Sequence, residues 1–166
     1  MRPETAVAGH GWNVSFQRRV GKDNLGALPC LLLSPASDRL RVLVPLRDGE
    51  ALWVAVLAEP TITLEGYAGP YRLRASVVSQ SIGHQSLLAL DGILVGERWA
   101  PLDATSLPRA SCRNEIDIDG LTIRLGRDSW SQELAVVLAT PALYESVSGF
   151  PLPQATFDSY GGWRLP

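Results

Sequence analysis

The sequence contains few residues of the kinds that build metal and redox sites. Its 166 residues include only two histidines and two cysteines, and His10, Cys30, His84 and Cys112 stand far apart along the chain. Zinc sites usually take several such ligands at close spacing, and no CxxC pair is present. We therefore expect no metal and no cofactor. The two cysteines are predicted to be reduced and buried, with a disulfide between them as the alternative.

Long apolar runs are also missing. No stretch approaches the roughly 18 consecutive apolar residues that cross a bilayer. Residues 1–9 lack the apolar core of a signal peptide. The formal net charge of −2 gives no electrostatic reason to expect nucleic acid or an anionic membrane as a partner. The sequence thus predicts a cytoplasmic protein that binds neither nucleic acid nor membrane.

Common catalytic motifs are absent as well. Neither of the two glycine-rich nucleotide-binding patterns occurs. The segment Gly83-His84-Gln85-Ser86 is similar to a nucleophile elbow, but Leu88 stands near the place where a second glycine is required. No residue is assigned a catalytic role. Whether the protein is an enzyme stays open, with a non-catalytic role favoured.

What the sequence does contain is three Asp-Gly pairs within alternating apolar runs. They are Asp48-Gly49, Asp91-Gly92 and Asp119-Gly120. A two-residue hairpin turn of type I′ needs positive φ at both central positions, which glycine adopts freely and aspartate better than most residues. Each pair therefore predicts an antiparallel β-hairpin, and the clearest case runs from Glu115 to Arg124.

Apolar and polar residues alternate in several further segments, which is the period of a strand with one wet face. The continuous apolar run from Leu28 to Leu33 predicts a central strand covered on both faces. Residues 129–139 fit a strand or a helix, and the adjacent Val136 and Val137 favour the strand. Residues 99–113 read as a long connection that crosses between two sheets.

One short helix is expected near the C-terminus. Thr140 and Pro141 suit an N-cap and a first helical position, and Gly149 suits the end of the helix. The last residues, 150–166, are rich in aromatic side chains, which a disordered tail would lack. They are predicted to pack on the body as an extended segment, whereas residues 1–10 are predicted to be a flexible N-terminus.

Together these patterns predict one all-β domain over residues 1–166. We expect an antiparallel two-sheet sandwich or flattened barrel of about ten short strands, with at most one short helix. Such folds host many unrelated functions, so the fold class by itself assigns none.

The candidate binding residues come from the five tryptophans and their neighbours. Trp99 and Trp163 lie in irregular segments beside arginine, and aromatic residues of this kind are common at binding surfaces. The predicted site residues are Trp99, Trp163, Arg98, Tyr160 and His84. We predict a non-catalytic binding or assembly module that contacts a protein or a carbohydrate-like ligand, and a homo-oligomer is possible. The alternative is a small-molecule-binding β-barrel, possibly an enzyme, with a pocket near His84.

Overall fold

The computed structural model describes residues 2–34, 39–82 and 84–152. In this part, the chain forms 13 strands, one α-helix and one short 3-10 helix. The strands are β1 (Val7–Gly9), β2 (Trp12–Val20), β3 (Asp23–Ala27), β4 (Leu31–Ser34), β5 (Arg39–Pro45), β6 (Ala51–Ala58), β7 (Thr63–Ala68), β8 (Tyr71–Ile82), β9 (Gln85–Val95), β10 (Arg98–Ala100), β11 (Leu102–Asp103), β12 (Leu121–Arg127) and β13 (Trp130–Ala139). The helices are η1 (Arg113–Glu115) and α1 (Pro141–Ser148).

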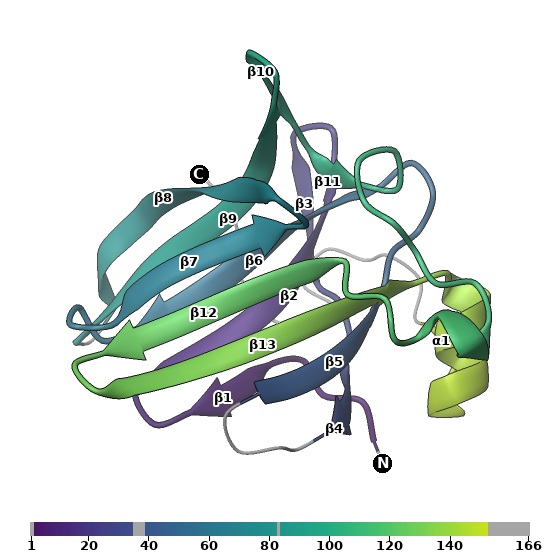
Figure 1. Ribbon diagram of the computed structural model, residues 1–166, viewed down its shortest axis with the longest axis horizontal. Coiled ribbons are helices and arrows are strands. Elements are labelled where there is room, and N and C mark those ends of the chain that lie inside the picture. Colours follow the sequence, from purple (N-terminus) through teal and green to yellow (C-terminus); the bar gives the residue numbers. More distant parts are fainter. Residues whose placement is uncertain (1, 35–38, 83, 153–166) are drawn as a thin grey trace.

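These strands form one mixed sheet that curls into a half-barrel (Figure 1). The main order is β1-β2-β6-β9-β8-β7-β12-β13-β5-β4, while β3, β10 and β11 pair at the side with β2, β9 and β6. Strand β13 runs parallel to β5, and the other pairings between named strands are antiparallel. The all-β class is therefore confirmed, and of the two expected arrangements the single curled sheet is closer to the flattened barrel than to the two-sheet sandwich.

The curled sheet has two halves that face each other. The first half contains β1, β2, β3, β6, β8, β9, β10 and β11, and the second contains β4, β5, β7, β12 and β13. On one side the halves are joined where β8 pairs with both β9 and β7. On the other side, Glu4 and Cys30 exchange two backbone hydrogen bonds of 2.8 Å each.

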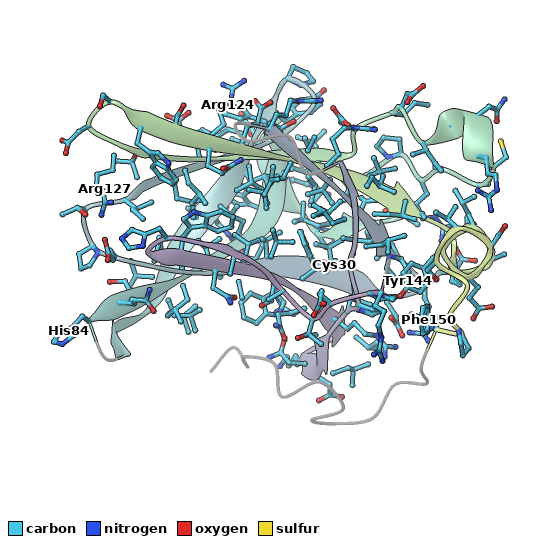
Figure 2. All side chains as sticks on the ribbon, turned by 90° about the horizontal axis from the view of Figure 1, so that it is seen from below. Cys30, His84, Arg124, Arg127, Tyr144 and Phe150 are labelled. Atoms are coloured by element: carbon cyan, nitrogen blue, oxygen red, sulfur yellow. The ribbon has the colours of Figure 1, made fainter. Side chains whose placement is uncertain are left out.

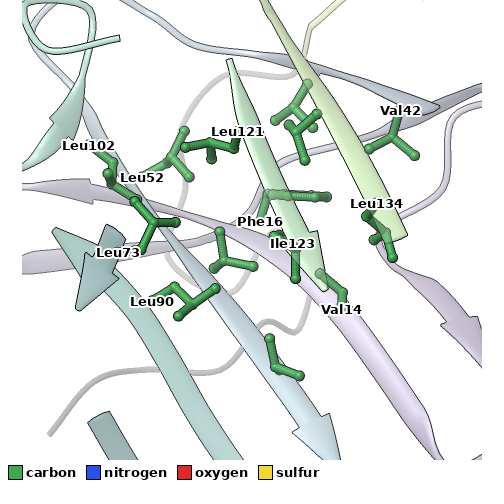
Figure 3. Packing of buried hydrophobic residues seen from close by; sticks show 14 of the residues in the cluster. Val14, Phe16, Val42, Leu52, Leu73, Leu90, Leu102, Leu121, Ile123 and Leu134 are labelled. Carbon is green, nitrogen blue, oxygen red and sulfur yellow. The ribbon is translucent and has the colours of Figure 1, made fainter. Parts of the chain in front are cut away.

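The main core lies between the two halves. Alternate residues of each strand point inward, so Phe16 and Leu90 of the first half meet Ile123 and Leu134 of the second (Figure 3). All four side chains are fully buried. The helix α1 packs on the outer face of β5 and β13, where Tyr144 contributes to a second apolar cluster.

The three predicted hairpins are wrong. Asp91 and Gly92 lie inside β9, and Asp119-Gly120 precedes β12, whose partners are β7 and β13. Asp48-Gly49 does form a turn, with φ of 75° at Gly49, but the flanking strands β5 and β6 do not pair with each other. A strand in which apolar and polar residues alternate can pair with any strand that helps to complete the core. Here the partners are strands more distant in the sequence.

Local contacts explain why the segment from Glu115 to Arg124 is not a hairpin. Glu115 belongs to η1, where its carboxylate accepts hydrogen bonds from Ser111 and Cys112. Asp119 instead accepts a hydrogen bond of 2.6 Å from Arg39 of β5. Glu115 and Asp119 thus take part in contacts other than those of a hairpin.

The close antiparallel connections that do occur have other turn residues. Strands β12 and β13 are joined by Asp128 and Ser129, with φ of 50° at Asp128, and β7 and β8 are joined by Gly69 and Pro70. Aspartate tolerates the left-handed region better than most residues, which permits the tight turn. Residues 129–139 were expected to favour a strand, and β13 confirms this.

Other local expectations have mixed outcomes. The helix is confirmed, since Leu143 N donates to the Thr140 hydroxyl and Gly149 ends α1 with φ of 75°. The run from Leu28 to Leu33 does not form a central strand, because β4 is the last strand in the sheet order. Its apolar residues are explained by contacts on two sides, as Leu28 faces the main core and Leu31 faces α1.

The long connection and the start of the chain contain short strands. Residues 7–9 form β1 on the edge of β2, although a flexible N-terminus was predicted over residues 1–10. The 99–113 connection leads from the first half of the sheet to the second, but it includes the short strands β10 and β11. The predicted extended segment 150–166 lies outside the described residues from position 153 onward.

Both cysteines are free thiols, in agreement with the reduced state predicted. Cys30 is buried, but Cys112 is exposed, because it caps the short surface helix η1 with its Sγ 2.9 Å from Glu115 Oε1. Burial, helped by the charge of Glu4, raises the pKa of the Cys30 thiol from 9.0 to about 12.

The two thiols should therefore differ in reactivity. At pH 8, a thiol reagent is expected to modify Cys112 in the native protein and to leave Cys30 untouched, because Cys30 is both inaccessible and protonated. Denaturation without reductant should raise the number of reactive thiols per chain from one to two. A Cys112→Ser variant should show no reactive thiol when native, and a native count of two would contradict the buried position of Cys30.

The raised pKa of Cys30 also predicts a pH dependence of stability. Between about pH 9 and about pH 12, the Cys30 thiol is deprotonated in the unfolded chain but keeps its proton in the folded chain. The free energy of unfolding therefore falls as pH rises. This contribution is fully present below pH 9. Urea titrations from pH 8 to 11 measure this dependence. The free energy of unfolding should decline less steeply with pH for Cys30→Ala than for the unaltered protein, and equal declines would contradict the raised pKa of Cys30.

Candidate functional site

A pocket of about 400 Å³ lies at one end of the first half of the sheet. It is bordered by the turns that follow β2 and β5, by the outer face of β8 and β9, and by β10 and β11. The lining residues are Arg19, Gly21, Gly49, Glu50, Ala51, Leu52, Arg74, Asp91, Trp99, Ala100, Pro101, Asp103, Ala104 and Thr105. Its volume is within the range typical of small-molecule sites.

A short hairpin brings Trp99 to this pocket. Strands β9 and β10 are joined by Gly96 and Glu97, and the positive φ of 63° at Gly96 is a conformation that glycine adopts without strain. Gly92 then allows β10 to approach β9 closely, because a Cβ at that position would lie 3.1 Å from the carbonyl oxygen of Ala100. The hairpin projects from the body at the β10 label in Figure 1.

Arg74 and Asp91 form the best-defined polar pair of the pocket. The guanidinium of Arg74 donates from Nε and Nη2 to the two carboxylate oxygens of Asp91, at 2.9 and 3.1 Å. The same guanidinium lies over the Trp99 ring, 5.1 Å from its centroid. The hydrogen bonds with Asp91 raise the pKa of Arg74 above its ordinary value. The pair and the ring thus form one connected surface, on which Trp99 is 48% exposed.

A second ion pair supports the opposite wall. Glu50 lines the pocket, and its carboxylate accepts hydrogen bonds from Nε and Nη2 of Arg18, the former at 2.9 Å. Only 2% of the Arg18 side chain is exposed, so its guanidinium is buried in the protein. Asp103 shapes the third wall, where its Oδ1 accepts from the backbone N–H groups of Thr105 and Ser106.

The charges around this pocket are largely balanced. Asp91 is neutralised by Arg74 and Glu50 by Arg18, which leaves Arg19 and Asp103 with opposite signs. A site with paired charges and a half-exposed indole offers hydrogen-bond donors, acceptors and an apolar ring without a net attraction for one sign of ligand. This chemistry suits an uncharged ligand with many hydroxyl groups.

Of the three predicted site residues that the structure describes, one lines the pocket. Trp99 lines it, whereas the neighbouring Arg98 is exposed and does not, because successive residues of a strand point to opposite sides. His84 is exposed in the turn between β8 and β9, seven residues before Asp91, and it does not line this pocket. Figure 2 shows His84 at the end of the molecule opposite Phe150. Tyr160 and Trp163 lie outside the described residues.

Sequence reasoning missed the polar part of the site. Asp91 was interpreted as a turn residue, and Arg74 was not among the predicted site residues. A signal was available in the sequence. Arg74 and Asp91 have opposite charges, and they lie in two successive segments in which apolar and polar residues alternate. Antiparallel pairing of β8 with β9, with Leu73 opposite Ile93 and Ala75 opposite Leu90, places them side by side.

Two other kinds of feature are absent from the described residues. In that part of the chain, no group of three or more His, Cys, Asp or Glu side chains is arranged to hold a metal ion. Nor does any helix there have the length and apolar composition needed to cross a membrane. Comparison of the chain with protein-family models, curated proteins and solved structures gives no match.

The Arg18–Glu50 pair should be important for stability. We expect Arg18→Ala to lower the free energy of unfolding by about 3 kcal/mol, because it leaves the carboxylate of Glu50 largely buried without its partner. Arg124→Ala is the control, since Arg124 is 57% exposed and its ion pair should contribute about 1 kcal/mol or less. Urea denaturation measures both values. Equal losses for the two variants would show that the pair does not stabilise the fold as a buried unit.

Proposed function

We propose that this protein is a non-catalytic binding module that takes an uncharged, polyhydroxylated, carbohydrate-like ligand in the pocket beside Trp99. The observation that carries this proposal is the half-exposed Trp99 ring, set beside the bidentate Arg74–Asp91 pair within a cavity of about 400 Å³. Aromatic rings bind the apolar face of a sugar, while neighbouring polar groups fix its hydroxyls. A ligand in this pocket would contact the ring and the ion pair together.

The state of the carboxylates supports binding rather than catalysis. General acid–base work needs a carboxyl group that can exchange a proton with the substrate. Asp91 and Glu50 each accept hydrogen bonds from both Nε and Nη2 of an arginine, so both carboxylates are already engaged within the protein. In this proposal they act as fixed acceptors and as anchors for the arginines.

The test is ligand binding by Trp99 variants. A panel of neutral mono- and oligosaccharides would be screened by saturation-transfer NMR, and the best ligand measured by titration calorimetry. Trp99→Ala is expected to weaken binding by about 2 kcal/mol, since it removes the aromatic contact area. Asp91→Asn should also weaken binding, because it disturbs the Arg74 guanidinium that lies over the ring.

Two variants serve as controls. Trp130→Ala removes an indole of similar exposure, 37%, from the β12–β13 hairpin away from the pocket, and His84→Ala removes the exposed histidine at the other end of β9. Both should bind the sugar normally. The proposal fails if no neutral sugar binds, or if Trp99→Ala binds as tightly as the controls. Loss of a measured activity in His84→Ala alone would favour the enzyme alternative.

A further inference from the structure

The outer face of the first half of the sheet carries an apolar cluster that its own strands cannot bury. The cluster contains Trp53 and Ala55 of β6 and Leu87 and Ala89 of β9, with Leu57 and Val78 at its margin. These residues all belong to the strands β6, β8 and β9. Side chains that stand on one face of a sheet shield each other only from the sides. Nevertheless, the exposed fraction of Trp53 is 0%.

Neighbouring polar residues on this face are equally shielded. Gln17 of β2 lies opposite Trp53 and is 0% exposed, and its Nε2 donates to the Ser15 hydroxyl at 2.8 Å. Among the described residues, its Oε1 has no hydrogen-bond partner. A buried amide oxygen without a partner is costly, so a donor is expected to approach this face from outside the sheet.

The described helix covers a different surface. Helix α1 packs on β5 and β13, and its Leu143 and Tyr144 belong to the cluster on the second half of the sheet. The last described residues after α1 lie close to the first half. Phe150 and Pro151 border a small pocket together with Thr5 and Pro29, which lie next to β1 and β3, the two strands paired with the edge of β2.

We propose that residues 153–166 dock across this outer face of β2, β6 and β9. The 14 residues extended reach about 46 Å, and crossing three strands takes only about 10 Å. Phe157, Tyr160 and Trp163 supply apolar area for the cluster around Trp53, and a backbone N–H of the extended segment, or the Tyr160 hydroxyl, supplies the donor for Gln17.

The same face continues into the proposed ligand pocket. Arg19, Ala51 and Asp91 each lie two residues along their strand from Gln17, Trp53 and Ala89, so they point to the same side. The docked segment would therefore form a neighbour of that pocket. The docking proposal does not depend on which ligand the pocket takes.

Thiol protection in the full chain tests the docking. In a Cys112→Ser background, Ala89→Cys places a thiol in the covered cluster, and Cys30 serves as an internal reporter of the main core. We compare this reporter with the added triple change Phe157→Ser, Tyr160→Ser and Trp163→Ser. The matched control changes three polar residues of the same segment, Gln154→Ser, Asp158→Ser and Arg164→Ser.

The expected result is specific to the aromatic change. The introduced thiol should be labelled at least about tenfold faster in the aromatic variant than in the control, since only there is its cover lost, while Cys30 stays unlabelled in both. Equal protection of the introduced thiol in the aromatic variant and the control would overturn the proposal. So would rapid labelling in the chain whose C-terminal segment is unaltered.

A second measurement covers the case in which the aromatic variant unfolds and Cys30 is labelled too. Ser159→Cys, again in the Cys112→Ser background, carries a nitroxide spin label while all the aromatic residues are kept. Relaxation broadening should be stronger at the methyl groups of Ala55 and Ala89 than at that of Ala135, which is buried in β13 of the second half. Equal broadening, or stronger broadening at Ala135, would refute docking on the first half.

Discussion

The packing of the two sheet halves against each other is the interaction on which the rest of the structure depends. Strands from both ends of the chain contribute to it, since β2 in the first half and β13 in the second both place every second side chain in the shared interior. Strand β13 pairs in parallel with β5, which requires a crossover connection, and the chain between them passes through the first half. The intervening segment builds β6, β8 and β9, and so it creates the face and the end at which the pocket lies.

Once the halves are closed, each has an outer face to cover, and the two faces are treated differently. On the second half, α1 covers the apolar surface of β5 and β13. On the first half, the composition changes along the strands, from apolar at Trp53 and Ala89 to charged at Arg19 and Asp91. The apolar part favours a covering segment and the charged part favours water or a polar ligand. The position of the candidate pocket is a consequence of this gradient.

Alternation of apolar and polar residues was enough to predict the strands, but it did not determine their partners. The all-β class, the strand at residues 129–139 and the capped helix at Thr140 were predictable because each depends on local preferences. Pairing is decided by which distant strands complete the interior, so the Asp-Gly pairs were misleading. Asp91-Gly92 shows this best, since the glycine provides space for β10 and the aspartate binds Arg74, and neither forms a turn.

The candidate site was predictable only in its aromatic member, for a related reason. An indole in an irregular segment next to an arginine is visible in the sequence, and Trp99 does reach the pocket. The groups that define its chemistry come from β8, β9 and the turn before β6, and they meet because β6, β9 and β8 are neighbours in the sheet. His84 directly precedes β9 and Asp91 lies inside it, seven residues further along the extended chain, so they could not share a small pocket. Distance along an extended strand separates them, just as pairing across strands joins Arg74 to Asp91.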